Sequence, residues 1–280
     1  MNFVLRHINL LLLLCIAYIV LYELHLFYQD QKGHLVDLGD SKTTQTPDST
    51  VVREHYYLLV LILSNSAKTR QVSRDNWNNE AYFRSRNVSL KILYVVGRDQ
   101  TDNHVETDII KTNVSESKPN LGLKVREGLK VAMERYSFEY LLKTDTDVFH
   151  NYTRWEERIK GTVRENGEPL LYGGCTCARH LYVQYGWCAG MGYILHHAIV
   201  EKVVNYPLDQ MENAEDRNTG KVMWEWGVKW RFSGGGRLKV TRADCKEGML
   251  SGVVAAHVGY SFRNVEIMKH CWDQIGVGYG

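Results

Sequence analysis

Two carboxylates stand at alternate positions where an apolar segment ends. Asp145 and Asp147 follow the run Tyr140–Leu142 in the stretch YLLKTDTDVF. If the chain turns there, both carboxylates can reach one hard divalent cation and the phosphates that it carries. A solvated turn can have the same sequence, but this pair comes at the end of a strand-like run, where α/β sheets place their ligand-binding crevices. The position therefore predicts a metal and phosphate site at Asp145 and Asp147.

The composition is typical of one globular core. The chain has 280 residues, of which 44% are hydrophobic, and its formal net charge is +2. A chain of this length can bury one sizeable core. A near-neutral charge without a long basic run gives no support for nucleic acid as a partner. We therefore expect one folded domain that binds no nucleic acid.

The N-terminal part of the chain is expected to lie outside that core. Residues 8–28 are mostly apolar and, as a helix, would extend about 31 Å, enough to cross a bilayer. Arg6 precedes them, which favours a cytosolic N-terminus. A cleaved signal peptide is the competing interpretation, but no small-residue cleavage site follows. We predict a cytosolic tail (residues 1–7), a transmembrane anchor (8–28), a polar stem (29–50) and a luminal domain (51–280).

Sequons and cysteines agree with a luminal domain. Three tripeptides have the Asn-x-Ser/Thr acceptor pattern, and they begin at Asn87, Asn113 and Asn151. Cys15 lies in the predicted anchor, which leaves five cysteines for the lumen: Cys175, Cys177, Cys188, Cys245 and Cys271. No second Cys or His pair has the spacing of a zinc site, so disulfide pairing is the expected role of these thiols.

Apolar runs and amphipathic segments alternate along the predicted luminal domain. Three apolar runs are each typical of a buried strand: Tyr56–Leu63, Leu90–Val96 and Phe138–Leu142. A later strand is expected at Val253–Val258. The helical segments are Ala67–Arg84, Leu121–Tyr136 and His196–Val204. The alternation predicts an α/β fold with a mostly parallel central sheet flanked by helices.

Six motifs in register resemble the inverting β-1,3-glycosyltransferases, which include β-1,3-galactosyltransferases, β-1,3-N-acetylglucosaminyltransferases and Fringe proteins. The resemblance extends over nearly all of residues 56–260. The motifs are Arg70–Trp77, Lys91–Gly97, Asn120–Lys124, Lys143–Phe149, Cys188–Leu195 and Glu215–Gly220.

The resemblance implies a GT-A type nucleotide-sugar-binding fold and a single-pass type II protein of the Golgi membrane. It also implies a UDP-sugar donor, a Mn²⁺ cofactor and a glycan or glycoprotein acceptor. The sugar would be transferred to the acceptor with inversion, in a β-1,3 linkage. Two motifs depart from the family pattern: Thr146 replaces an acid, and residues 217–219 replace the usual sequence after the acidic pair. These changes leave open a catalytically weak or inactive relative that binds glycans or nucleotide sugars or acts as a chaperone. A tethered adhesion domain is a third class.

The metal site is assigned to Asp145, Asp147 and His257. Asp147 is the expected metal ligand, while Asp145 is expected nearer the nucleotide ribose or a metal-bound water. The resemblance implies a histidine in the region of His257, although a lone histidine is as often a packed core residue.

The remaining candidates surround the donor and the reacting hydroxyl. The expected donor-binding residues are Arg70, Arg74, Lys143, Asp145, Gly190 and Gly192. Each of these residues also has a purely structural interpretation. Arg70 and Arg74 could form a solvated charged helix face, Lys143 could form an ion pair, and the two glycines could permit tight helix packing. Asp216 is the expected catalytic base and Glu215 its structural neighbour, against the alternative of a carboxylate that only stabilises a helix N-terminus. Trp224 and Trp226 can stack on a sugar ring or form strand core and edge.

Overall fold

The computed structural model describes residues 53–100, 107–174, 176–179, 185–208, 214–231, 237–240, 255–258 and 265–275. The helices and strands below belong to one compact unit, residues 49–225 and 229–280. The predicted tail, anchor and stem (residues 1–50) lie outside the described residues. Within the described ranges, every helix is too short or too polar to cross a membrane.

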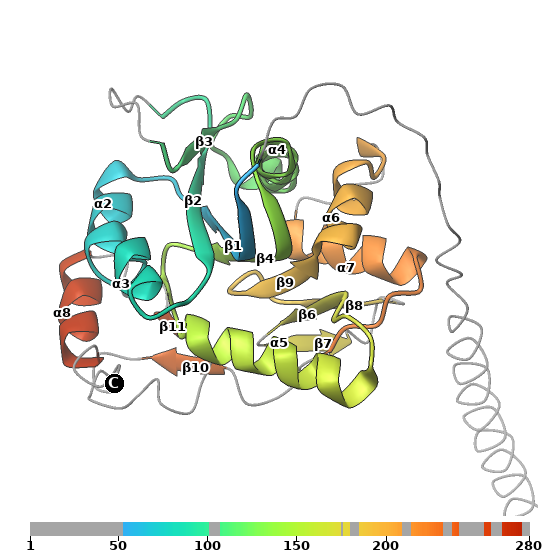
Figure 1. The fold of residues 1–280 in the computed structure, drawn as a ribbon. Helices are drawn as coiled ribbons and strands as arrows, with labels where there is room; N and C mark the ends of the chain where they lie inside the picture. Colours follow the sequence, from blue (N-terminus) through green and yellow to red (C-terminus); the bar gives the residue numbers. More distant parts are fainter. Residues whose placement is uncertain are drawn as a thin grey trace, which may run out of the picture. The chain divides into compact units, whose positions relative to one another are not determined.

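A six-stranded mixed sheet forms the centre of this unit (Figure 1). In spatial order its strands are β3 (Ile109–Lys111), β2 (Leu90–Val96), β1 (His55–Leu63), β4 (Ser137–Asp145), β9 (Tyr193–His196) and β6 (Tyr172–Gly174). The first four are parallel, whereas β9 is antiparallel to both β4 and β6. The sheet is thus mostly parallel as predicted, with an antiparallel edge that the sequence patterns did not indicate.

Helices cover both faces of the sheet. They are α2 (Ala67–Asp75), α3 (Glu80–Arg84), α4 (Leu121–Arg135), α5 (Tyr152–Asn166), α6 (His197–Val204), α7 (Glu215–Glu225) and α8 (Val265–Ile275), with a short 3₁₀ turn at Lys118–Asn120. On one face, Val60 of β1 packs in a core cluster with Phe83 of α3 and Trp155 of α5. On the other face, α4 lies so close that a Cβ at Gly128 would be 2.8 Å from Val95. Burial on both faces explains why β1 and β2 are continuous apolar runs.

Two smaller sheets accompany the central one. The first contains β10 (Arg237–Val240), β11 (Ala255–Val258) and β5 (Val148–His150), and the second is a hairpin of β7 (Cys177–Arg179) and β8 (Gly186–Cys188). A disulfide joins Cys177 to Cys188 across the hairpin, and Cys271 is disulfide-bonded as well. The prediction of disulfides in place of a zinc site is confirmed for these cysteines.

Most predicted elements are present, with shifted ends. The strand predicted at Phe138–Leu142 extends through Asp145, so the first acid of the pair is the last residue of β4. The single helix predicted over Ala67–Arg84 is wrong, because α2 ends at Asp75 and Asn79 begins α3 by accepting a hydrogen bond from the backbone N–H of Tyr82.

Candidate active site

A buried lysine links two acids at the carboxyl end of β4. The Nζ atom of Lys143 lies 3.1 Å from Oδ1 of Asp145 and also pairs with Oε1 of Glu215, the first residue of α7. The side chain of Lys143 is 1% exposed, whereas that of Asp145 is 39% exposed. The cluster therefore begins in the core and reaches solvent through Asp145.

The charges in this cluster act strongly on one another. Burial by itself would lower the pKa of Lys143, but the negative charges of Asp145 and Glu215 outweigh it, so the pKa is raised and Lys143 stays charged. Burial raises the pKa of the Glu215 carboxyl; the Lys143 charge opposes this, and Asp145 and Asp216 reinforce it. Two carboxylates thus pair with the single ammonium of Lys143, and Asp216 acts on the cluster through its repulsion of Glu215.

Gly190 lies between the lysine and the second acid of α7. Its carbonyl accepts a hydrogen bond from Nζ of Lys143 at 3.1 Å, and its backbone N–H donates to Oδ2 of Asp216 at 3.2 Å. A Cβ at this position would be 2.7 Å from Oε1 of Glu215 and 3.2 Å from Nζ of Lys143. Gly190 therefore permits a close approach of backbone to the charged cluster. The backbone N–H of Gly192 donates to the carbonyl of Ala189 at 3.1 Å and so belongs to the same turn.

The two acids at the start of α7 have different surroundings. Glu215 is buried, and both of its oxygens are engaged, since Oε2 accepts a hydrogen bond from the Tyr193 hydroxyl at 2.8 Å. Asp216 is half-buried, and its Oδ1 accepts from the backbone N–H of Arg217 at 2.9 Å. Asp216 also lies in the first turn of α7. As the alternative interpretation expected, its carboxylate can therefore stabilise the helix N-terminus. Asp216 is nevertheless the more accessible acid of the two.

The second acid of the Asp-x-Asp pair lies in the turn between β4 and β5. Asp147 is half-buried there, and the backbone of His257 in β11 pairs with that of Val148, the residue after Asp147. The chain path thus brings the third predicted ligand beside the acid pair, although the His257 side chain is outside the described part of the structure. Among the side chains that are described, no three His, Cys, Asp or Glu residues converge on one metal position.

A buried hydrogen-bond chain supports the turn that carries the acid pair. Nε1 of Trp155 donates to Nδ1 of His150 at 3.0 Å, and Nε2 of His150 lies 2.6 Å from the Thr144 hydroxyl, which donates to the carbonyl of Met191 at 2.9 Å. Burial lowers the pKa of His150 to about 3, so the ring is neutral. The chain ties β4 and β5 to the Gly190 turn. Sequence reasoning missed His150, whose only signal was its place directly after the Asp-Val-Phe motif.

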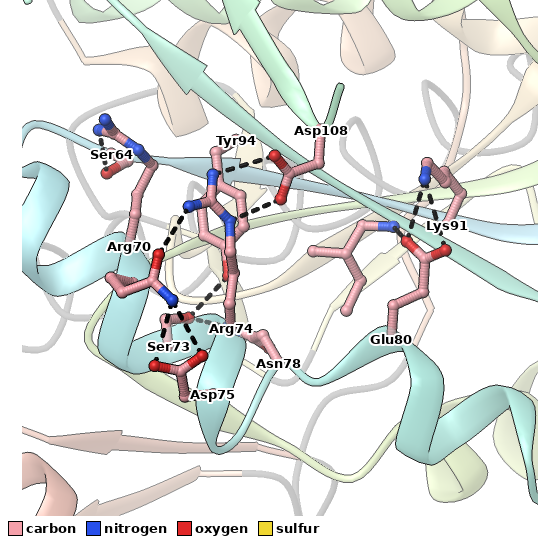
Figure 2. A network of polar contacts seen from close by, with 12 residues as sticks. Ser64, Arg70, Ser73, Arg74, Asp75, Asn78, Glu80, Lys91, Tyr94 and Asp108 are labelled. Carbon is pink, nitrogen blue, oxygen red and sulfur yellow. Dashed lines mark hydrogen bonds and ion pairs between the residues drawn. The ribbon is translucent and has the colours of Figure 1, made fainter. Parts of the chain in front are cut away.

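The two arginines of α2 have separate partners. Arg70 is buried, and its Nη1 donates to Oγ of Ser64, just beyond the end of β1, at 3.3 Å. Arg74 forms a bidentate pair with Asp108, at 2.7 Å from Nε to Oδ2 and 2.9 Å from Nη2 to Oδ1 (Figure 2). Arg70 therefore stays near the carboxyl ends of the parallel strands, while Arg74 joins α2 to the segment before β3.

A second lysine, which sequence reasoning did not select, lies at the same strand ends. Nζ of Lys124 in α4 donates to the Ser64 carbonyl at 2.8 Å and to Oε1 of Glu116 at 2.6 Å. Burial lowers the pKa of Lys124, and hydrogen bonding to Glu116 opposes the change. The signal for this residue was present in the sequence, because Lys124 ends the motif Asn120–Lys124.

Trp224 and Trp226 are both exposed. Trp224 lies near the end of α7 and is 48% exposed, and Trp226 follows the helix and is 46% exposed. The alternative that they form strand core and edge is wrong.

Comparison with protein families gives one match. Residues 68–186 match the Galactosyltransferase family. The matched segment contains Arg70, Arg74, Lys143, Asp145 and Asp147, and it ends before Gly190 and Asp216. The resemblance to galactosyltransferases predicted from the motifs is thereby confirmed, and the match supports a glycosyltransferase. A comparison with curated proteins gave no significant match.

Solved structures give remote similarities. One is a glycosyltransferase involved in glycosylation of the major capsid of the virus PBCV-1, with 13% identity, 76% of this chain and 98% of that chain covered, and a TM-score of 0.48. Another is a Drosophila β-1,4-galactosyltransferase 7 mutant in complex with manganese, UDP-Gal and xylobiose, with 12% identity, 76% and 79% covered, and a TM-score of 0.38. We draw no conclusion about function from similarities this remote.

Proposed function

We propose that this chain is a GT-A type glycosyltransferase that transfers a hexose or N-acetylhexosamine from a UDP-sugar to a hydroxyl of a glycan or glycoprotein. Transfer proceeds with inversion and forms a β-1,3 linkage. The observation that carries the proposal is the cluster in which Lys143 and Gly190 bring Asp145 of β4 together with Glu215 and Asp216 of α7. Asp145 and Lys143 belong to the segment that matches galactosyltransferases.

Asp216 is the proposed base. Its half-buried carboxylate takes the proton of the acceptor hydroxyl while that oxygen forms a bond to the anomeric carbon of the donor. The bond from that carbon to the diphosphate oxygen breaks on the opposite face, and UDP leaves with the electron pair. One base opposite the leaving group suffices for inversion, as in inverting glycosidases. The backbone N–H groups of Gly190 and Arg217 each hold one oxygen of Asp216, which fixes the orientation of the carboxylate.

The acid pair is the proposed cation site. Asp145, Asp147 and His257 would hold Mn²⁺, which would neutralise the charge that develops on the departing diphosphate. Lys143 and Glu215 position this site without touching the donor, because both are buried and paired with each other. Arg70 and Lys124, which both bond to Ser64 just beyond the end of β1, are the proposed neighbours of the nucleotide.

The location of the chain is part of the proposal. Residues 8–28 would anchor a single-pass type II protein in the Golgi membrane with its catalytic domain in the lumen. Two of the three sequon asparagines, Asn87 and Asn113, are exposed, and the Cys177–Cys188 disulfide suits an oxidising compartment. Endoglycosidase digestion of the expressed chain should lower its apparent mass. An unchanged mass, with the domain open to protease from the cytosolic side of sealed vesicles, would rule out this topology.

The test of activity is UDP release by the purified full chain with a panel of UDP-sugars and Mn²⁺. We expect turnover with UDP-galactose or UDP-N-acetylglucosamine when a suitable glycan is present, and none with Asp216→Asn. The matched control is Asp273→Asn, an exposed aspartate of α8. UDP-sugar binding without any release of UDP would instead identify a binding protein on this scaffold.

A further inference from the structure

A row of aromatic rings follows α7 away from the proposed base. Tyr185 lies 6.3 Å from Trp187 and 6.4 Å from Trp224, measured between ring centroids. Trp187 belongs to β8, and α7 packs directly on it, since a Cβ at Gly220 would be 2.4 Å from the Trp187 Cβ. The rings are therefore held in place by α7, which carries Glu215 and Asp216, and by β8, which leads into the turn that contains Gly190.

The exposure of these rings differs. Tyr185 is buried, and the guanidinium of Arg217 lies 5.5 Å from the centroid of the Trp187 ring. Trp224 is 48% exposed, which makes it the ring of this row that is most open to a ligand. Trp and Tyr are enriched at binding interfaces, because each combines a large apolar ring with a polar N–H or O–H, and Trp224 offers such a ring beside Tyr185.

The distance from the base limits what Trp224 can contact. Asp216 and Trp224 belong to one continuous helix, and eight residues of helix rise by about 12 Å. This span exceeds one sugar ring, so Trp224 is too far along the helix to contact the sugar that carries the reacting hydroxyl. It can contact a later sugar of an acceptor chain whose end lies at Asp216.

We propose that Trp224 forms an acceptor subsite that stacks on an internal sugar of an oligosaccharide, so that the enzyme prefers glycan chains to single sugars. This inference rests on the proposed function, because it takes Asp216 as the reaction point. The apolar faces of pyranose rings pack well against a flat indole, and Tyr185 holds that indole without covering it. Arg217, two helical turns before Trp224 on the same face, has its guanidinium against the Trp187 ring and so lies along the path between the two points.

The experiment has a binding arm and a kinetic arm. In the first, the full chain with UDP and Mn²⁺ is applied to an array of oligosaccharides of graded length, beside Trp224→Ala, Trp224→Phe and Leu208→Ala. Leu208 is a matched control, because it is another exposed large apolar side chain at 55%. In the second, a glycan that binds and its versions shortened from the far end are compared as acceptors.

We expect glycans of several residues to be retained by the unchanged chain and by Leu208→Ala. Trp224→Ala should raise the KM for the long acceptor about tenfold, equivalent to the loss of ~1.4 kcal/mol. The same change should leave the KM for the UDP-sugar and for the shortest acceptor as they were, and Trp224→Phe should lie between.

Equal effects of Trp224→Ala on long and short acceptors would overturn the subsite, as would the absence of any effect or of any glycan bound on the array. Binding of long glycans that depends on Trp224, without transfer from any UDP-sugar, would leave the subsite in place and refute the proposed function. The two inferences therefore fail in distinguishable ways.

Discussion

Nε2 of His150 lies 2.6 Å from the hydroxyl of Thr144, and both side chains are fully buried. Because Trp155 donates to Nδ1, the proton of the neutral ring is on Nε2 and is donated to Thr144. The Thr144 hydroxyl can then donate only to Met191, next to Gly190. Thr144 before the acid pair and His150 after it are thus fixed by one chain of hydrogen bonds, in which every donor has one acceptor.

These hydrogen bonds predict that removing the Thr144 hydroxyl will destabilise the fold. Thr144→Val keeps the volume but leaves His150 and the Met191 carbonyl without this partner, so the free energy of unfolding should fall by about 1–3 kcal/mol. Urea denaturation of the purified chain measures it. Ser117→Ala is the control, because the Ser117 side chain is exposed and makes no capping hydrogen bond. A Thr144 variant as stable as the parent would mean that this chain of hydrogen bonds contributes nothing to the free energy of unfolding.

His150 also predicts a dependence of stability on pH. Its pKa is 6.5 in an unfolded chain and about 3 in the fold, so between these values the unfolded state binds a proton that the folded state does not. The stability that the neutral ring contributes is therefore complete above pH 6.5 and is lost as the pH falls towards 3. We expect the free energy of unfolding to fall by about 1.4 kcal/mol per pH unit from this group.

His150→Gln removes the titrating ring and should flatten that slope. His196, whose pKa burial lowers to about 4, is present in both proteins and cancels in the comparison. Denaturation curves at several pH values between 6 and 4 give the two slopes. Identical slopes would show that His150 is not buried as a neutral ring.

The acid pair predicts a metal dependence. Asp147→Ala removes a carboxylate from the proposed Mn²⁺ site, so transfer should fall by about a hundredfold or more, and Mn²⁺ binding measured by calorimetry should weaken in parallel. Asp145→Ala should have an equal or milder effect. The thermal unfolding midpoint of the variant separates the loss of a ligand from a loss of folded protein. Normal Mn²⁺ affinity in the Asp147 variant would show that other residues bind the cation.

Gly190 predicts a sharp contrast with another glycine. In Gly190→Ala the new methyl group would meet Oε1 of Glu215 at 2.7 Å, so the charged cluster must shift; we expect a loss of about 1–3 kcal/mol in stability and a large loss of transfer. A Cβ at Gly161 in α5 meets nothing within 4 Å, so Gly161→Ala should stabilise the helix by about 0.5–1 kcal/mol. Thermal unfolding and UDP release measure both variants, and similar behaviour of the two would contradict the site geometry.

The sequence predicted those elements whose burial is visible in local pattern. Residues 56–63 and 90–96 are uninterrupted apolar runs because helices cover both faces of the sheet, and both are strands in the structure. The antiparallel edge was missed because Gly186–Leu195 looks like one segment. It is in fact two strands, β8 and β9, separated by the turn that contains Gly190.

The candidate site could be predicted only in part. Motif order selected Lys143, Gly190 and Asp216, which the structure brings together. The pairing of Lys143 with Glu215 joins residues 72 positions apart, so no local pattern can indicate it. His150 was missed although its partners Thr144 and Trp155 are only six and five positions away, because their contact depends on the turn between β4 and β5 and on where α5 begins.

The division of labour between Glu215 and Asp216 gives the last prediction. Asp216→Asn keeps the shape and the acceptor oxygen for the Gly190 N–H but removes basicity, so kcat should fall by about a hundredfold or more while UDP-sugar binding stays nearly constant.

Glu215→Gln acts differently, because Glu215 is the buried partner of Lys143. Removing its charge leaves the ammonium with Asp145 alone, so the variant should lose stability by about 3–5 kcal/mol, and activity should fall with the folded fraction. Thermal unfolding separates the two cases, because the Asp216 variant should unfold near the parent's midpoint and the Glu215 variant well below it. A stable but inactive Glu215→Gln beside an active Asp216→Asn would transfer the role of base to Glu215. In that arrangement the Lys143 ammonium, in contact with Oε1, would oppose proton uptake by the very group that must accept the proton.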